Sequence, residues 1–242
     1  MGLDRDWAIV GAGVTEYDKL TRERLASQDW LTTIVELDPE QLSARITGAM
    51  IDFVEINSRL LVKAMAEPNI RIVSLTVTEG GYFVDSETGG FDASAPEIQK
   101  DANKPQDPKT VFGIIIAALL KRRDAGIAPF TVMTCDNLPE NGVVAKQAVL
   151  GLAKHQGDDV HDWISDNVTF PNSMVDCITP ATSEREIGIV RDTFGIDDKA
   201  PVVCEPFHQW VLEDNFCNGR PALEKVGVEF VEDVEPLSLI HI

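Results

Sequence analysis

The sequence has few cysteines, and none of them is placed as metal ligands usually are. Its four cysteines form no CxxC pair, and no Cys/His cluster has the spacing of a zinc finger. There is no apolar run long enough to span a membrane, and the charged start MGLDRDW is unlike a signal peptide. We therefore expect reduced thiols, no bound metal and a cytoplasmic location.

Positive charge is scarce as well. The chain has 21 Lys and Arg residues against 40 Asp and Glu, which gives a formal net charge of −19. A surface of this charge repels nucleic acid and anionic membranes, although an acidic balance also simply keeps a protein soluble. We expect neither nucleic acid nor a membrane among the partners.

Two common catalytic motifs are missing. The sequence contains no GxSxG elbow and no GxxxxGK[ST] loop, so it shows neither the α/β-hydrolase nor the P-loop signature. What it does contain is apolar residues: 44% of the 242 residues are hydrophobic, which is enough for one large or two small cores.

Segments typical of strands and helices alternate along the chain. We interpret residues 110–123 as an amphipathic helix and residues 80–108 as a long surface loop. Strands separated by helices indicate βαβ units, so we expect an α/β fold. Its doubly wound, mostly parallel Rossmann-type sheet would carry a β-rich extension. The predicted strands are 7–14 (buried), 33–37, 44–47, 70–78, 130–135, 202–204 and 228–231, and the other predicted helices are 21–28, 57–66, 142–155 and 182–193.

The segment WAIVGAGVTEYD, residues 7–18, allows two interpretations. Gly11 and Gly13 resemble the start of a dinucleotide fingerprint, but Glu16 stands in place of the third glycine and would repel a pyrophosphate. Alternatively, this is the second strand of a Rossmann unit, whose tip carries an acid that binds the adenosine ribose. Asp18 suits that role and disfavours NADP, although a helix N-cap explains it equally well.

Polar residues follow two of the predicted strands. Thr76 and Thr78 end the segment 70–78, while Asp136 and Asn137 follow 130–135. Ligands of open α/β sheets bind outside the carboxyl ends of the strands, and the Asn137 amide has donors that can stabilise an alkoxide. Ordinary turn residues, with Asn137 capping the next helix, give the same pattern.

Several segments in order resemble one family. They are IRIVSLTVTEGGY (70–82), PFTVMTCDNLPENG (129–142), FPNSMVDCITP (170–180), VVCEPFHQWVLED (202–214) and GRPALEKVGVEFVEDVEP (219–236). Together they resemble the mannitol dehydrogenase family of long-chain polyol dehydrogenases. The resemblance implies a Rossmann-type domain, a mainly helical C-terminal domain, and a zinc-independent monomer. It also implies hydride transfer between NAD and a polyol such as mannitol, or within a related uronate pair.

The resemblance assigns roles to individual residues. In the family a lysine is the general base, two asparagines stabilise the substrate oxygen, and a histidine binds substrate. Carried over to this sequence, the catalytic residue is Asn137, the substrate-side residues are Val175 and Asp176, and the cofactor-binding residues are Asp18, Thr76 and Thr78.

The sequence also departs from the family. Cys177 replaces an arginine that would pair with the preceding carboxylate. The tail LSLIHI replaces the stretch with the catalytic lysine, and the phosphate loop would lie before Met1. We therefore predict that residues 1–232 are an NAD-binding domain lacking its first βα unit. Residues 233–242 would be a stub of the catalytic domain, and the chain an inactive fragment. The alternative is a naturally short, non-catalytic nucleotide-binding or interaction protein.

Overall fold

The computed structural model describes residues 6–38 and 42–234. They pack as two compact units, each built from two separate stretches of chain. Unit 1 contains the residues up to Asn57 and Asp176–His208, and unit 2 contains Ser58–Val175 and the residues from Gln209 onward. The tail LSLIHI lies outside the described residues, so the predictions made for it stay predictions. No helix in the described ranges is long and apolar enough to cross a bilayer.

Unit 1 is built around β2, which pairs with β3 in antiparallel and with β8 in parallel orientation. Its core joins Val35 of β2, Val203 of β8 and Val190 of α7. The strands predicted at 33–37, 44–47 and 202–204 are confirmed. The elements of unit 1 are β1 (Ile9–Gly11), α1 (Tyr17–Ala26), β2 (Thr32–Leu37), β3 (Leu42–Thr47), β4 (Met50–Phe53), α7 (Glu184–Phe194) and β8 (Val202–Cys204).

The first strand is shorter and more exposed than the sequence predicts. Only Ile9–Gly11 is extended, and it pairs in parallel with β4 alone among the described strands. Ile9 and Val10 are 55% and 36% exposed. The prediction of a buried strand over residues 7–14 is therefore wrong in the described structure, because only one side of β1 has a neighbouring strand.

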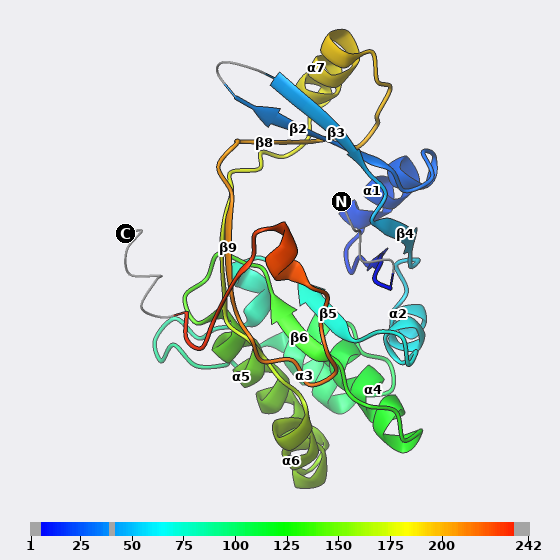
Figure 1. The fold of residues 1–242 in the computed structure, drawn as a ribbon. Coiled ribbons are helices and arrows are strands. Elements are labelled where there is room, and N and C mark those ends of the chain that lie inside the picture. The colour runs from blue at the N-terminus through cyan, green and yellow to red at the C-terminus, as the bar shows by residue number, and fades with distance from the viewer. Residues whose placement is uncertain (1–5, 39–41, 235–242) are drawn as a thin grey trace. The chain divides into compact units, whose positions relative to one another are not determined.

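Unit 2 places the parallel pair β5 and β6 beside helices α3 to α6 (Figure 1). A second sheet, β10-β9-β7, supplies the predicted β-rich extension. The elements of this unit are α2 (Ser58–Met65), β5 (Ile72–Leu75), η1 (Glu79–Tyr82), α3 (Pro96–Asn103), α4 (Val111–Asp124), β6 (Thr131–Thr134), α5 (Asn141–Ala153), η2 (Lys154–Gln156), α6 (Asp158–Asn167), β7 (Ser173–Asp176, whose last residue falls in unit 1), β9 (Gln209–Glu213), η3 (Leu223–Val226) and β10 (Glu229–Val231).

Helix α4 is the buried centre of unit 2. It packs against α2, α3 and α5, and most of its residues are buried on every side. The prediction of an amphipathic helix is therefore wrong, although its position is right. Even Arg122 in the last turn is fully buried, where it donates to the carbonyls of Met65, Glu67 and Ala128 at 2.7–2.9 Å.

The predicted loop over 80–108 contains a helix. Helix α3 begins with Pro96 at its first turn and buries Ile98 and Asp101. The Asp101 carboxylate accepts hydrogen bonds from the backbone of Lys109 and Thr110, both at 2.8 Å, just before α4 begins. The turn-forming residues around α3 hid it from a prediction based on composition, because a single buried face of eight residues is a weak signal.

Candidate functional site

The carboxyl ends of β5 and β6 frame an open pocket. The two strands run parallel and in register, with Leu75 opposite Thr134, so the residues after them emerge at the same edge. The pocket has a volume of about 480 Å³ and is lined by Thr78, Glu79, Gly80, Asp136 and Asn137. The structure therefore brings together Thr78 and Asn137, two of the predicted site residues.

Asp136 organises this pocket. One carboxylate oxygen accepts hydrogen bonds from the Val77 backbone N–H at 2.9 Å and from the Tyr82 hydroxyl at 2.6 Å. The other accepts from the Thr78 backbone N–H at 3.2 Å. Bonds to an ionised acceptor are stronger than neutral ones, so this single side chain fixes the loop after β5 to the end of β6.

The hydroxyl of Tyr82 is held as a donor. Its side chain is fully buried, and burial raises the pKa of the phenol, which the bond to Asp136 and its negative charge raise further. The neighbouring Cys135 thiol behaves alike: burial, with a smaller contribution from Asp136, raises its pKa to about 11. Both groups therefore stay neutral at physiological pH.

Thr78 has a strained backbone. Its φ of 63° with ψ of 164° lies where a β-branched residue is rarely found. Such conformations cost about 1–3 kcal/mol and persist where surrounding contacts impose them, often at functional sites. Here the bonds from Asp136 to two successive amides impose it, and they set the rim of the pocket.

Asn137 keeps its amide available. The side chain is exposed, and no hydrogen bond to it is formed within the part of the chain that the structure describes. The following helix α5 begins at Asn141 with Glu140 at its N-cap position. The interpretation of Asn137 as a helix cap is therefore wrong, and two free amide donors line the pocket.

A buried asparagine that sequence reasoning missed supports the Asn137 turn. Asn141 donates to the carbonyl of Asp136 at 2.9 Å and to that of Ser173 at 2.8 Å, and its own oxygen accepts from the Ser173 N–H at 2.9 Å. These bonds join the turn to the first residue of β7. Asn141 lies in a segment that carries the family resemblance, but no spacing rule distinguishes it from its neighbours.

Three predicted site residues do not line this pocket. Thr76 is exposed just after β5, and Val175 and Asp176 are half-buried at the end of β7. Asp176 begins the stretch of chain assigned to unit 1, whereas Val175 belongs to unit 2. Their roles as cofactor-side and substrate-side residues stay predictions.

Asp18 lies in the first turn of α1 and folds back onto the preceding loop. Its Oδ2 accepts from the backbone N–H groups of Val14 and Thr15 at 3.0 and 2.9 Å, and from the Thr15 hydroxyl at 2.8 Å. A pyrophosphate would need those same amides, so the glycine loop is not an open phosphate cradle. Glu16, and not Asp18, holds the N-cap position. No printed bond uses Oδ1 of Asp18, which leaves an acceptor for a ribose hydroxyl.

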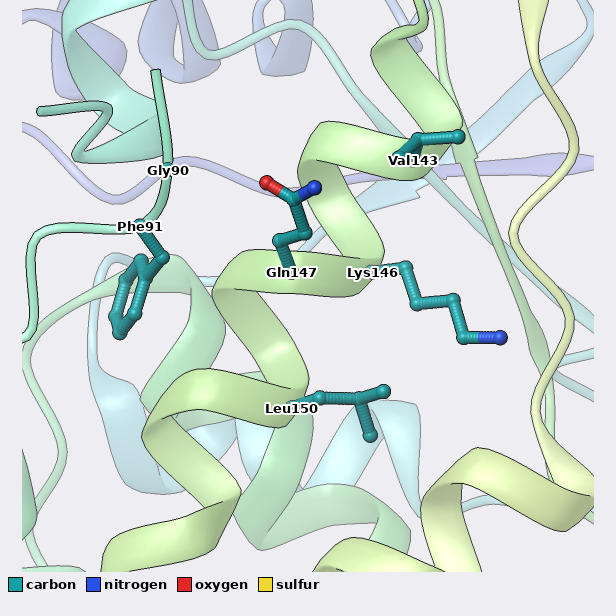
Figure 2. Close-up of a pocket in the computed structure, with 6 residues that line it drawn as sticks. All are labelled: Gly90, Phe91, Val143, Lys146, Gln147 and Leu150. Carbon is teal, nitrogen blue, oxygen red and sulfur yellow. The ribbon is translucent and has the colours of Figure 1, made fainter. Parts of the chain in front are cut away.

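A second pocket in unit 2 has a different character. Phe91, Val143 and Leu150 give it an apolar wall beside Lys146 and Gln147 (Figure 2). It lies on the flank of α5 and not at a strand end. Neither pocket is a metal site, because the described residues contain no cluster of three or more His, Cys, Asp or Glu able to hold an ion.

Comparison with known proteins identifies the family. Residues 3–225 match the mannitol dehydrogenase Rossmann domain. Mannitol 2-dehydrogenase of Cereibacter sphaeroides is 53% identical over 100% of this chain and 51% of its own length. The polyol:NADP oxidoreductase of Gluconobacter oxydans is 47% identical over 95% of this chain and 48% of its own.

The fold agrees with a solved structure of the same kind. Mannitol 2-dehydrogenase of Pseudomonas fluorescens, in a ternary complex with NAD and D-mannitol, superimposes with a TM-score of 0.93 at 52% identity. The match covers 98% of this chain and 49% of that one, so the chain spans about half the length of these relatives. The chain belongs to the mannitol dehydrogenase family, and it has the Rossmann-type α/β fold of that family's first domain.

Proposed function

We propose that this chain supplies the NAD-binding half of an oxidoreductase that transfers hydride between NAD and a secondary alcohol of a polyol, as between mannitol and fructose. The observation that carries the proposal is the pocket where Thr78 and Asn137 meet at the carboxyl ends of two parallel strands. Ligands of open α/β sheets bind at this edge. Relatives named for mannitol and polyol oxidoreduction share about half of their sequence with it.

The residues present fit a dinucleotide. The strained rim at Thr78 and the adjacent Gly80, whose Cβ position is open, leave room for a flat ring against the strand ends. Asp18, with one free carboxylate oxygen, suits an adenosine ribose. When bound, NAD accepts the hydride of the alcohol carbon. The Asn137 amide then donates to the substrate oxygen, whose negative charge grows as its proton leaves.

The base for the hydroxyl proton is not supplied by the pocket. None of the five lining residues is lysine or histidine, and the Asp136 carboxylate already accepts three hydrogen bonds. We propose that the base comes from outside the described residues. On this view residues 1–232 form the NAD-binding domain, residues 233–242 lead into the next one, and the chain alone does not turn over.

We further place the protein in the cytoplasm as a monomer with no nucleic-acid partner. The four cysteines are unpaired, and the net charge of −19 opposes polyanions. Sedimentation would test the monomer directly, and a concentration-dependent dimer would contradict it.

Two measurements on the purified chain test the function together. NADH binding, followed by energy transfer from tryptophan, should be detectable, whereas NAD with D-mannitol should produce no NADH above the blank. Absence of NADH binding to a chain that unfolds cooperatively would remove the nucleotide role. Mannitol-dependent NADH formation would instead show that the base lies within the chain.

Asp18 provides the sharpest variant. Asp18→Asn keeps an acceptor for the Val14 and Thr15 amides but removes the charge, so we expect NADPH binding to rise about tenfold relative to NADH, a change of about 1.4 kcal/mol. Asp18→Ala also removes the loop contacts and should weaken both nucleotides. An unchanged NADH/NADPH ratio in Asp18→Asn would refute the selecting role.

A further inference from the structure

Two cysteines meet where separate stretches of unit 1 lie side by side. The Glu205 backbone N–H donates to the Ile178 carbonyl at 3.1 Å, and the Ile178 N–H donates back to the Glu205 side chain at 2.6 Å. Cys177 and Cys204 immediately precede these two bonded residues. The pairing therefore holds the two thiols next to each other, although they are distant in the sequence.

The two thiols are in direct contact. Burial raises the pKa of Cys204, and both the charge of the Cys177 thiolate and a hydrogen bond between the two side chains raise it further. Cys177 also accepts a hydrogen bond from the Thr179 hydroxyl, with an O···S distance of 3.8 Å. Cys204 also donates to the Val35 carbonyl at 3.7 Å. Both residues are half-buried, so a small solute can reach them.

The other two cysteines lack such a partner. Cys135 adjoins Asp136, and the Cys217 sulfur lies 3.5 Å from the Thr131 hydroxyl. Among the described residues, neither is hydrogen-bonded to another thiol. Cys177 is also the residue that stands where the family resemblance has arginine, so the pair is a feature of this chain.

We propose that Cys177 and Cys204 form a redox-active dithiol site that hydrogen peroxide converts into an intramolecular disulfide. The Cys177 thiolate attacks one peroxide oxygen and breaks the O–O bond, which gives a sulfenic acid and the first water once the leaving hydroxide is protonated. Cys204 then attacks that sulfur, loses its proton and displaces the second water. Two thiols are oxidised, and one peroxide is reduced to two waters.

The environment assigns the order of the two steps. The Thr179 hydroxyl donates to Cys177 and stabilises its thiolate, which is the reactive form. The raised pKa of Cys204 keeps that thiol protonated until the sulfenic acid forms beside it. A disulfide needs Cβ atoms about 4 Å apart, and thiols already in contact require only a small rotation to reach this.

The experiment is oxidation of the purified chain with peroxide, followed by alkylation of the remaining thiols and peptide mass spectrometry. Trypsin places Cys177 on residues 155–185, and places Cys204 together with Cys217 on residues 200–225. Cleavage after Glu205 separates those last two. The expected product is a reducible cross-link between Cys177 and Cys204, with two of the four thiols lost.

Matched variants and a denatured control make the test decisive. Cys217→Ser should keep the cross-link, whereas Cys177→Ser and Cys204→Ser should abolish it and retain their other thiols. The urea-unfolded chain should form mixed pairs. Cross-links in the folded chain that involve Cys135 or Cys217 as often as this pair, or oxidation to single sulfinic acids with no cross-link, would overturn the proposal.

A probe that requires no oxidant gives an independent check. Phenylarsine oxide bridges two neighbouring thiols, so one equivalent should protect Cys177 and Cys204 together from alkylation. The protection should disappear in either single serine variant. Equal protection of all four thiols, or of none, would contradict the site. Neither measurement depends on nucleotide binding or on the proposed oxidoreductase function.

Discussion

At the scale of single residues, Asp136 determines the shape of the candidate pocket. Its carboxylate accepts from two backbone amides of the loop after β5 and from the buried Tyr82 hydroxyl. The strained Thr78 backbone depends on these bonds, because a β-branched residue has no intrinsic preference for that conformation. A side chain placed beside the reacting amide thus acts through geometry.

We predict that Asp136→Asn lowers the free energy of unfolding by about 2–3 kcal/mol, because bonds to a charged acceptor are replaced by weaker ones and one donor is left unsatisfied. Urea denaturation measures this. Tyr82→Phe removes a single bond and should cost less, so an equal loss in the two variants would contradict the central place of Asp136.

The buried thiol and phenol predict a loss of stability in alkali. The Cys135 pKa rises from 9.0 to about 11 on folding, and that of Tyr82 rises from 10.0. The folded chain thus holds these protons more tightly than the unfolded chain. Their contribution to stability is complete below about pH 9 and is lost as pH rises toward and beyond 11.

Urea midpoints measured across this alkaline range should therefore fall. Part of the fall comes from general repulsion in a chain of net charge −19. The double variant Cys135→Ala with Tyr82→Phe retains that repulsion and should show a shallower decline. Parallel curves for the two proteins would exclude the assigned groups.

At the scale of elements, α5 is anchored by a residue distant in sequence. The Asn172 side-chain oxygen accepts from the N–H groups of Gly142 and Val143 at 2.9 and 3.2 Å, in the first turn of the helix. Glu213 of β9 holds Asn172 through its side chain and its backbone. The start of α5, and with it the Asn137 turn, therefore depends on β9.

We predict that Asn172→Ala destabilises the chain by about 2 kcal/mol, at the upper end for a lost helix cap, because Glu213 also loses its partner. Ser183→Ala removes the local capping box of α7 with Glu186 and should cost about 1 kcal/mol. Thermal or urea unfolding compares the two. A smaller effect for Asn172 than for Ser183 would contradict the coupling between α5 and β9.

At the scale of the whole molecule, the described chain has two compact units with separate cores. One core joins β2, β8 and α7 around Val35, and another joins β6, β9 and their neighbours around Leu212. The stretches that build the two units alternate along the sequence, with boundaries at residues 57/58, 175/176 and 208/209.

We predict that Val35→Ala, which creates a cavity worth roughly 2 kcal/mol, loosens unit 1 first. Hydrogen exchange should speed up in β2 and β8 while the amides of β5 and β6 keep their protection. Val132→Ala in β6, equally buried, is the matched control and should show the reverse pattern. Equal acceleration in both units would indicate one cooperative structure.

The sequence by itself determined the fold class, the family and the positions of most elements, because hydrophobic period and turn residues are local signals. It also indicated that polar residues after two strands would share an edge, since parallel strands in register end together. The tertiary structure decided which side of each element is covered. Thus α4 is buried all round where an exposed face was predicted, and β1 is exposed where a buried strand was predicted.

The tertiary structure also decided the supporting contacts of the site. Asp136 with Tyr82, Asn141 with Ser173 and Asn172 with Glu213 join residues tens of positions apart. The Cys177 and Cys204 thiols meet only because two distant stretches pair in unit 1. No local pattern specifies such pairs, because they form only when the chain closes on itself and each buried polar group must find a partner.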